Sequence, residues 1–284
     1  MHKGLRGLGV SICYIEIQYL HQLKMKYKAL TTDPFEHYFY EHAQWLEEAW
    51  SVTAANTLAT SYLDALAEIW LRDFPDAKKK LEKDNSGKPP ASIRLARFLK
   101  QFIPNDPDVN KVAVLCFAED WKHYRPQDAH LADQIINKRV NKDPNNIFYG
   151  NEVPKAYLDV PRDELAKECP ELAANPDLLA LVEEYEYGAI LYSLYRCPLV
   201  HTATNSNRTN GFVGREERSM YYWSLDGSGR VTIGFGTHLI TRWLCNAVTG
   251  YVQACHEAGI IPANNIDAGS SQEERFKKLW SKIK

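Results

Sequence analysis

The chain has 284 residues, a formal net charge of -2, 45% hydrophobic residues and 25% charged residues. This composition is typical of a folded globular protein and excludes an intrinsically disordered one. The charge also excludes a global positive field that would attract nucleic acid, so any RNA contact must be local. No run of about 18 apolar residues predicts a membrane span. Because residues 1–23 match a signal peptide poorly, the expected compartment is the cytoplasm.

The N-terminal part of the chain is predicted to be helical after an extension. Asp33-Pro34 has the form of a helix start, because Asp can cap the first amides and Pro suits the first turn. Apolar residues at steps of three and four then predict one long helix from Phe35 to about Phe74. The polar stretch from Asp76 to Pro90 contains Asn-Ser-Gly and Pro-Pro, which predicts a loop. Its run Lys78-Lys79-Lys80 could contact phosphate, although such runs are usually solvated surface.

The middle of the chain alternates helical and irregular patterns. Two amphipathic helices are expected over Ser92–Ile103 and Asp108–Tyr124. Six prolines interrupt residues 125–176, which indicates an insertion of short helices and loops. A strongly periodic helix is expected to start at a capping Asp177 and to kink or end near Cys197, because the following proline disfavours helical geometry there.

The C-terminal part combines a hairpin with a final helix. The β-prone runs Met220–Leu225 and Arg230–Phe235 flank Asp-Gly-Ser-Gly and predict a hairpin, and Thr237–Ala258 returns to helical spacing. The predicted fold is all-α, a helical bundle with a small β-hairpin and an irregular insertion. Its expected parts are an N-terminal extension (1–33), the helical domain (34–262, with the insertion at 125–176 and the hairpin at 219–236) and a polar C-terminal tail (263–284).

The stretch that indicates chemistry is Leu191-Tyr192-Ser193-Leu194-Tyr195-Arg196-Cys197-Pro198-Leu199-Val200-His201. It resembles the signature of HEPN proteins, an Arg and a His separated by four to six residues at the end of a long amphipathic helix. The early segments Ser61–Leu66 and Arg97–Leu99 also look like the opening helices of that family. The resemblance covers roughly residues 34 to 260, with 125–176 as an unfamiliar insertion, and implies a HEPN-like helical bundle.

The resemblance to HEPN ribonucleases implies a metal-independent endoribonuclease without a cofactor, in which the ribose 2′-OH attacks the adjacent phosphate. Arg196 and His201 are the implied catalytic pair. An imidazole titrates near neutral pH and can exchange a proton with the 2′-OH or the leaving 5′-oxygen. A guanidinium stays cationic and can stabilise charge on the phosphate. The family further implies a homodimer with a composite site, and a role as a toxin or in defence against phage.

Five neighbouring residues are softer candidates for binding RNA: Asn205, Asn207, Arg208, Tyr192 and Tyr195. Ordinary turn chemistry explains the asparagines about as well, and aromatic residues at helical spacing are more often core. For the motif itself, the alternative is that Arg196 caps a helix end and His201 is a turn residue. His238 and His256 have no Cys or carboxylate at ligand spacing and are interpreted as structural, so no metal site is predicted.

A second function remains open beside the enzyme. Members of the family often place a polar residue directly after the Arg, where this chain has Cys197. The alternative is therefore a catalytically silent HEPN module that binds RNA or a partner protein, such as an antitoxin or a nucleotidyltransferase. The six cysteines are scattered without a C-x-x-C pair, so a disulfide scaffold is not expected, and no phosphate-binding loop or His-Glu-x-x-His motif occurs.

Overall fold

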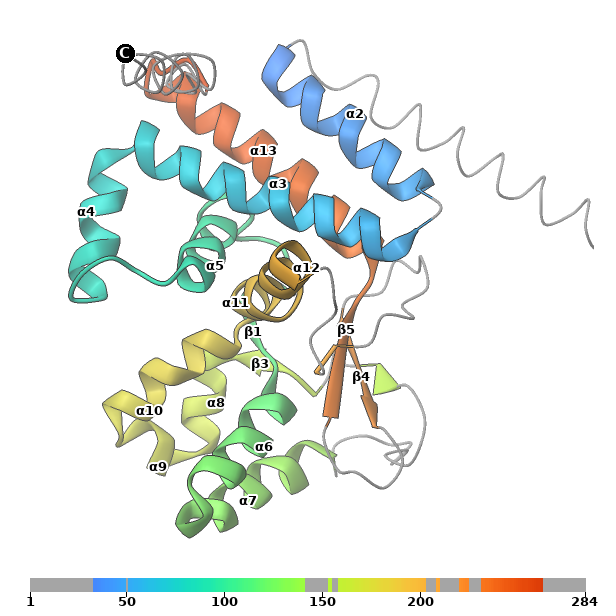
Figure 1. Ribbon diagram of the computed structural model, residues 1–284. Coiled ribbons are helices and arrows are strands. Elements are labelled where there is room, and N and C mark those ends of the chain that lie inside the picture. The colour runs from blue at the N-terminus through green and yellow to red at the C-terminus, as the bar shows by residue number, and fades with distance from the viewer. Residues whose placement is uncertain are drawn as a thin grey trace, which may run out of the picture.

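The computed structural model (Figure 1) describes residues 33–49, 51–140, 153–154, 158–202, 208–209, 220–224 and 231–262. This part of the chain is mostly helical, which confirms the all-α prediction. The extension before Asp33 and the tail after Pro262 lie outside it. No helix in the described ranges has the length and hydropathy needed to cross a membrane.

The first predicted helix is in fact two. The helix α2 (Pro34–Glu48) begins at the predicted cap, where Asp33 Oδ1 accepts hydrogen bonds from the backbone amides of residues 35 and 36 at 2.9 and 3.2 Å. The helix α3 (Val52–Asp73) has its own cap, because Ser51 Oγ accepts a hydrogen bond from Ala54 N at 3.2 Å. A single long helix was therefore wrong. Splitting it lets both amphipathic halves bury their apolar faces on the same core.

The expected loop after α3 is also wrong in its first half. Residues Pro75–Asp84 form α4, whose apolar Leu81 is buried, and the turn follows only at Asn85–Gly87. Proline at the first position and acidic Asp76 in the first turn favour this helix start. The helix α5 (Ala91–Phe102) lies close to the predicted bounds.

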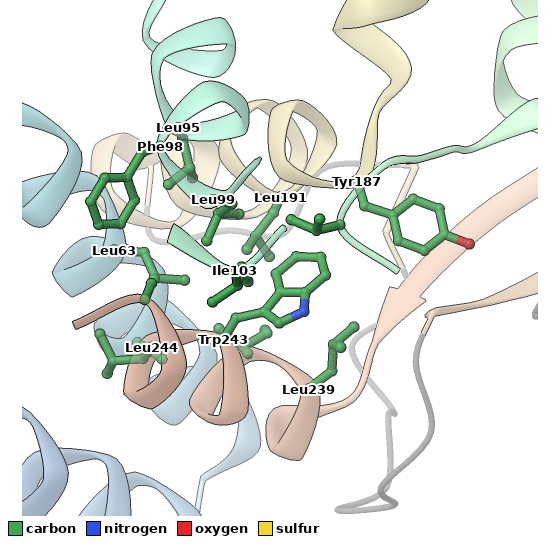
Figure 2. Close-up of a cluster of buried hydrophobic side chains, with 14 of the residues drawn as sticks. Leu63, Leu95, Phe98, Leu99, Ile103, Tyr187, Leu191, Leu239, Trp243 and Leu244 are labelled. Atoms are coloured by element: carbon green, nitrogen blue, oxygen red, sulfur yellow. The ribbon is translucent and has the colours of Figure 1, made fainter. Parts of the chain in front are cut away.

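The main bundle consists of α2, α3, α5, α11 (Tyr187–Ile190) and α13 (Thr237–Glu257), packed around one apolar core. The long α13 contacts α2, α3 and α5 (Figure 1). Trp243 points into the centre of the core, among leucines from several helices (Figure 2). Its side chain is fully buried, as are those of Leu63 and Leu239. Burial of this apolar surface is the main term that stabilises the fold.

Most of the described part of the region expected to be an irregular insertion belongs to a second core, here named the small lobe (residues 112–140 and 160–182). It contains α6 (Val114–Tyr124), the 3-10 turn η1 (Pro126–Asp128), α7 (Ala129–Val140), α8 (Arg162–Glu168), α9 (Pro170–Ala173) and α10 (Pro176–Leu181). Phe117, Trp121 and Leu172 are buried at its centre. In Figure 1 these helices lie together beside the main bundle.

Short strands connect the two parts. β1 (Lys111–Val112) pairs antiparallel with β3 (Val160–Pro161), so the helix expected from Asp108 begins only at Val114. The predicted hairpin is present as β4 (Met220–Ser224) paired antiparallel with β5 (Val231–Phe235), with Tyr222 opposite Ile233. A further strand that the sequence pattern did not indicate, β2 (Val153–Pro154), lies on the other edge of β4.

The helix that carries the motif is interrupted rather than continuous. Asn175, not Asp177, is the cap of α10. After the 3-10 turn η2 (Val182–Tyr185), Glu186 is extended, with a ψ of 148°. The chain becomes helical again in α11, widens to a π-helical turn, η3 (Leu191–Arg196), and continues as α12 (Cys197–Thr202). It therefore does not end at Pro198.

Candidate functional site

Arg196 lies on η3 and is held by contacts within the chain. Its Nε is 3.0 Å from Oδ2 of Asp64, which is nearly buried on α3. The guanidinium carbon lies 5.5 Å from the centre of the Tyr192 ring, within the range of a cation–π contact. The Arg196 side chain is still 22% exposed. Asp64 and Tyr192 thus fix its orientation, while part of the side chain remains open to solvent.

The local backbone explains how η3 comes to lie against α3 and α5. Gly188 permits a close approach, because a Cβ there would lie 2.8 Å from the Cα of Ala96 on α5. The π turn that follows carries Arg196 on its last residue, and the amide of Cys197 bonds to Tyr192 O, five residues back. A widened turn is one way for a helix to accommodate the ring and the missing N–H of Pro198.

His201 lies on α12, and its residue is exposed. It has no hydrogen bond or ion pair with any residue that the structure describes. Its imidazole is therefore accessible and is not engaged as the structural turn residue that the alternative interpretation required.

The two motif residues leave one helix in different directions. Both lie on one helix, and five residues of α-helix rotate a side chain by roughly 140° about the axis and raise it by roughly 7.5 Å. A single helix therefore directs Arg196 and His201 to different sides. A second group, from another segment or another copy, would be needed beside each of them to complete a two-residue site.

The structure adds two residues that the sequence analysis missed. Asp64 also binds Arg94 on α5, with Nη2 of Arg94 2.6 Å from Oδ1, so one carboxylate holds two guanidinium groups. Arg94 pairs in addition with Glu68. A charged residue inside the apolar face of α3 was a usable signal for Asp64, because such a residue is rarely buried without a partner.

Two of the softer candidates are engaged elsewhere. Tyr195 is 3% exposed, and its hydroxyl donates to Ile233 O at 3.2 Å and accepts from Phe235 N at 3.0 Å. Arg208 is buried against α6, where it pairs with Glu119 at 3.2 Å and with Asp120. Neither side chain is available to RNA in this conformation. Of the five, Tyr192 alone lies at Arg196, and Asn205 and Asn207 lie outside the described residues.

The histidines on α13 have carboxylate partners that sequence spacing did not reveal. His238 Nδ1 lies 3.4 Å from the buried Glu47 on α2, and His256 Nε2 lies 3.2 Å from Asp33. Each pair links α13 to the N-terminal part of the bundle, so both histidines have a carboxylate contact within the fold. Among the described residues no group of three His, Cys, Asp or Glu side chains is arranged to hold a metal ion.

Five of the six cysteines lie in the part of the chain that the structure describes. Cys116, Cys169, Cys197, Cys245 and Cys255 are free. Burial raises the pKa of Cys116 to about 12, which leaves it as an unreactive thiol.

Comparison with protein-family models, with curated proteins and with solved structures found nothing that matches this chain.

Proposed function

We propose that this chain is a metal-independent endoribonuclease that acts as a homodimer, with Arg196 and His201 as its catalytic residues. The observation that carries the proposal is that Arg196 is held in one orientation while His201 is exposed. Arg196 is oriented by Asp64 and Tyr192 on a π turn, and His201 is exposed on the same helix. π turns within helices occur frequently at functional sites.

In the proposed reaction, the 2′-oxygen of one ribose attacks the adjacent phosphorus as it loses its proton to an imidazole. The bond from phosphorus to the 5′-oxygen breaks, and that oxygen takes up the proton from the imidazolium that has formed. The products are a 2′,3′-cyclic phosphate and a 5′-hydroxyl. His201 supplies proton transfer, and Arg196 stabilises the negative charge that accumulates on the non-bridging oxygens.

The separation of the two side chains around one helix supports a dimer. Two copies related by a two-fold axis would place Arg196 of one chain beside His201 of the other. Such a site needs no further catalytic residue. The stabilisation of negative charge on the phosphate depends on Asp64, because Asp64 holds Arg196 in place. The role in toxicity or phage defence follows from the resemblance to HEPN ribonucleases alone.

The test uses labelled single-stranded RNA in EDTA with the full chain. We expect cyclic-phosphate ends, and a fall in rate of about 10²–10⁴-fold for His201→Ala and about 10²–10³-fold for Arg196→Ala. His130→Ala, which alters an exposed histidine on α7 with no ion pair among the described residues, is the matched control and should keep full activity. Mixing the two inactive variants should restore part of the rate, since one of the two sites of a mixed dimer is intact.

Intact RNA that is retained without cleavage would contradict the enzyme and favour the catalytically silent RNA-binding module. Capture of a partner protein without RNA affinity would favour the catalytically silent module that binds a partner protein. Activity that survives both substitutions would exclude this pair.

A further inference from the structure

Positive charge is concentrated in one hairpin of a chain that is acidic overall. Residues Pro75–Phe102, which form α4, the turn and α5, contain eight basic and three acidic side chains, a net charge of +5. The whole chain has a net charge of -2. The basic residues are Lys78, Lys79, Lys80, Lys83, Lys88, Arg94, Arg97 and Lys100. Outside this segment, Asp64, Glu68, Glu183 and Glu186 pair with the three cations of α5, so the uncompensated surplus lies on α4 and the turn. Such a surplus can attract polyanions even when the net charge of the protein does not.

A hollow of about 190 Å³ lies between α4 and α5. Lys80 comes from α4, and Arg97 and Lys100 come from α5. Trp70 and Leu81 form its apolar part and are themselves buried. The run Lys78-Lys79-Lys80, interpreted from sequence as solvated surface, is thus divided by the helix, because only Lys80 faces the hollow.

The cations of α5 are held in position by buried carboxylates. Arg97 Nε lies 2.5 Å from Glu183, and Lys100 Nζ lies 2.5 Å from Glu186, whose side chains are 12% and 1% exposed. Lys80 has no carboxylate partner among the residues that the structure describes, whereas Lys79 pairs with Asp76. Of the three cations that line the hollow, Lys80 is therefore the one whose positive charge is least compensated by carboxylates.

The charges around the hollow limit what it can bind. Asp84 also lines it, and together with the two glutamates it balances the three cations. A single small anion would gain little there. A strand with several phosphates gains more, since it can contact the hollow and further cations at once.

Such further cations continue toward Arg196. Arg94 precedes Arg97 by about one turn of α5, and it shares Asp64 with Arg196. The six residue steps from Arg94 to Lys100 span roughly 9 Å, the rise of roughly two to three stacked nucleotides. The helix α5 thus carries Arg97 at the hollow and Arg94 at Asp64, the carboxylate that also holds the candidate catalytic arginine.

We propose that the hollow between α4 and α5 is a subsite for a backbone phosphate of the RNA strand whose scissile phosphate lies at Arg196. This inference rests on the proposed function for its substrate. In this subsite Lys80 binds the phosphate. Arg97 and Lys100, which are held in position by carboxylates, lie beside it, and the negative charge of Asp84 weakens the binding.

The test measures binding of a fluorescent 2′-O-methyl RNA oligonucleotide, which cannot be cleaved by 2′-OH attack, to the full chain in EDTA by anisotropy. Lys80→Glu should weaken binding about tenfold and lower the slope of log K against log salt by about one. Lys79→Glu makes the same charge change one position away and should stay within about twofold. Asp84→Asn should tighten binding.

Equal losses for Lys79→Glu and Lys80→Glu, or no loss for either, would overturn the subsite, as would absence of RNA binding by the unaltered chain. Millimolar inorganic phosphate that displaces the oligonucleotide from the unaltered chain but not from Lys80→Glu would assign the hollow to free phosphate instead, and would also overturn it. Because the oligonucleotide is not cleaved, the pattern is independent of catalysis. If the expected changes in binding are found while Arg196→Ala and His201→Ala still cleave RNA, the proposed catalytic pair is wrong but the subsite is retained.

Discussion

The main bundle and the small lobe are held by different kinds of interaction. The bundle has a large continuous apolar core in which Leu63, Leu239 and Trp243 have no exposed surface. The small lobe has a smaller core around Phe117 and Trp121, and buried hydrogen bonds to Asp159 join it to the bundle. Apolar contact is not directional, whereas hydrogen bonds fix position and angle. Buried apolar area therefore stabilises the bundle, whereas directional hydrogen bonds fix the position of the small lobe against it.

Asp159 is the centre of that junction. It is 2% exposed and accepts hydrogen bonds from Val114 N at 3.0 Å, from Tyr187 OH at 2.6 Å and from Tyr222 OH at 2.6 Å. These donors come from α6, α11 and β4. Burial, together with the nearby carboxylate, raises the pKa of both tyrosines well above the usual value, so they remain donors at any physiological pH.

The largest effect is expected from the bundle core. Trp243→Ala should reduce the free energy of unfolding by about 3–5 kcal/mol, because it opens a cavity that the core cannot fill. Urea unfolding followed by circular dichroism measures this loss. Trp243→Phe should cost less, since it also removes an indole N–H that has no hydrogen-bond partner in the described structure. A loss below about 1 kcal/mol for the alanine variant would mean that the core does not dominate stability.

A smaller effect, confined to one region, is expected at the junction. Asp159→Ala leaves three buried donors without an acceptor and should cost about 2–4 kcal/mol. Hydrogen exchange should show faster opening of α6–α10 while α3 and α13 stay protected. Tyr222→Phe, which removes one of the bonds, should cost about 1 kcal/mol. If exchange accelerates equally everywhere, the two regions form one cooperative unit, and the contrast between them is wrong.

The smallest effect concerns the pH dependence of the ion pair between Glu186 and Lys100. Burial raises the pKa of Glu186 above its ordinary value of 4.5, and Lys100 offsets part of that rise. The folded state thus binds the proton more tightly than the unfolded chain. The stability that this provides is complete below pH 4.5 and is lost as pH rises through the raised pKa.

Glu186→Gln removes this titration. The unfolding free energy of the unaltered chain should therefore fall relative to that of the variant as pH increases from about 4.5, measured by urea unfolding at several pH values. Glu257→Gln, at an exposed position of α13, is the control and should give a constant difference. A constant difference for Glu186→Gln as well would show that burial does not perturb this carboxyl group.

Local signals predicted those parts of the fold whose cause is local. Asp33 caps α2 because its side chain reaches the next amides, and the hairpin follows from two β-prone runs around a glycine-rich turn. The helix α13 follows from its periodic apolar face. The breaks at Ser51 and Glu186 were not predicted, because helical periodicity continues across both and only packing shows where the chain must turn.

The candidate site divides in the same way. The sequence by itself determined the residue types of the motif and their separation along the chain, since these depend on no distant contact. Only the tertiary structure decided that Asp64 and Tyr192 orient Arg196, that Arg208 and Tyr195 are engaged elsewhere, and that Lys80 faces a hollow. Ion pairs and burial join residues from separate elements, and no local pattern encodes which of those elements will meet.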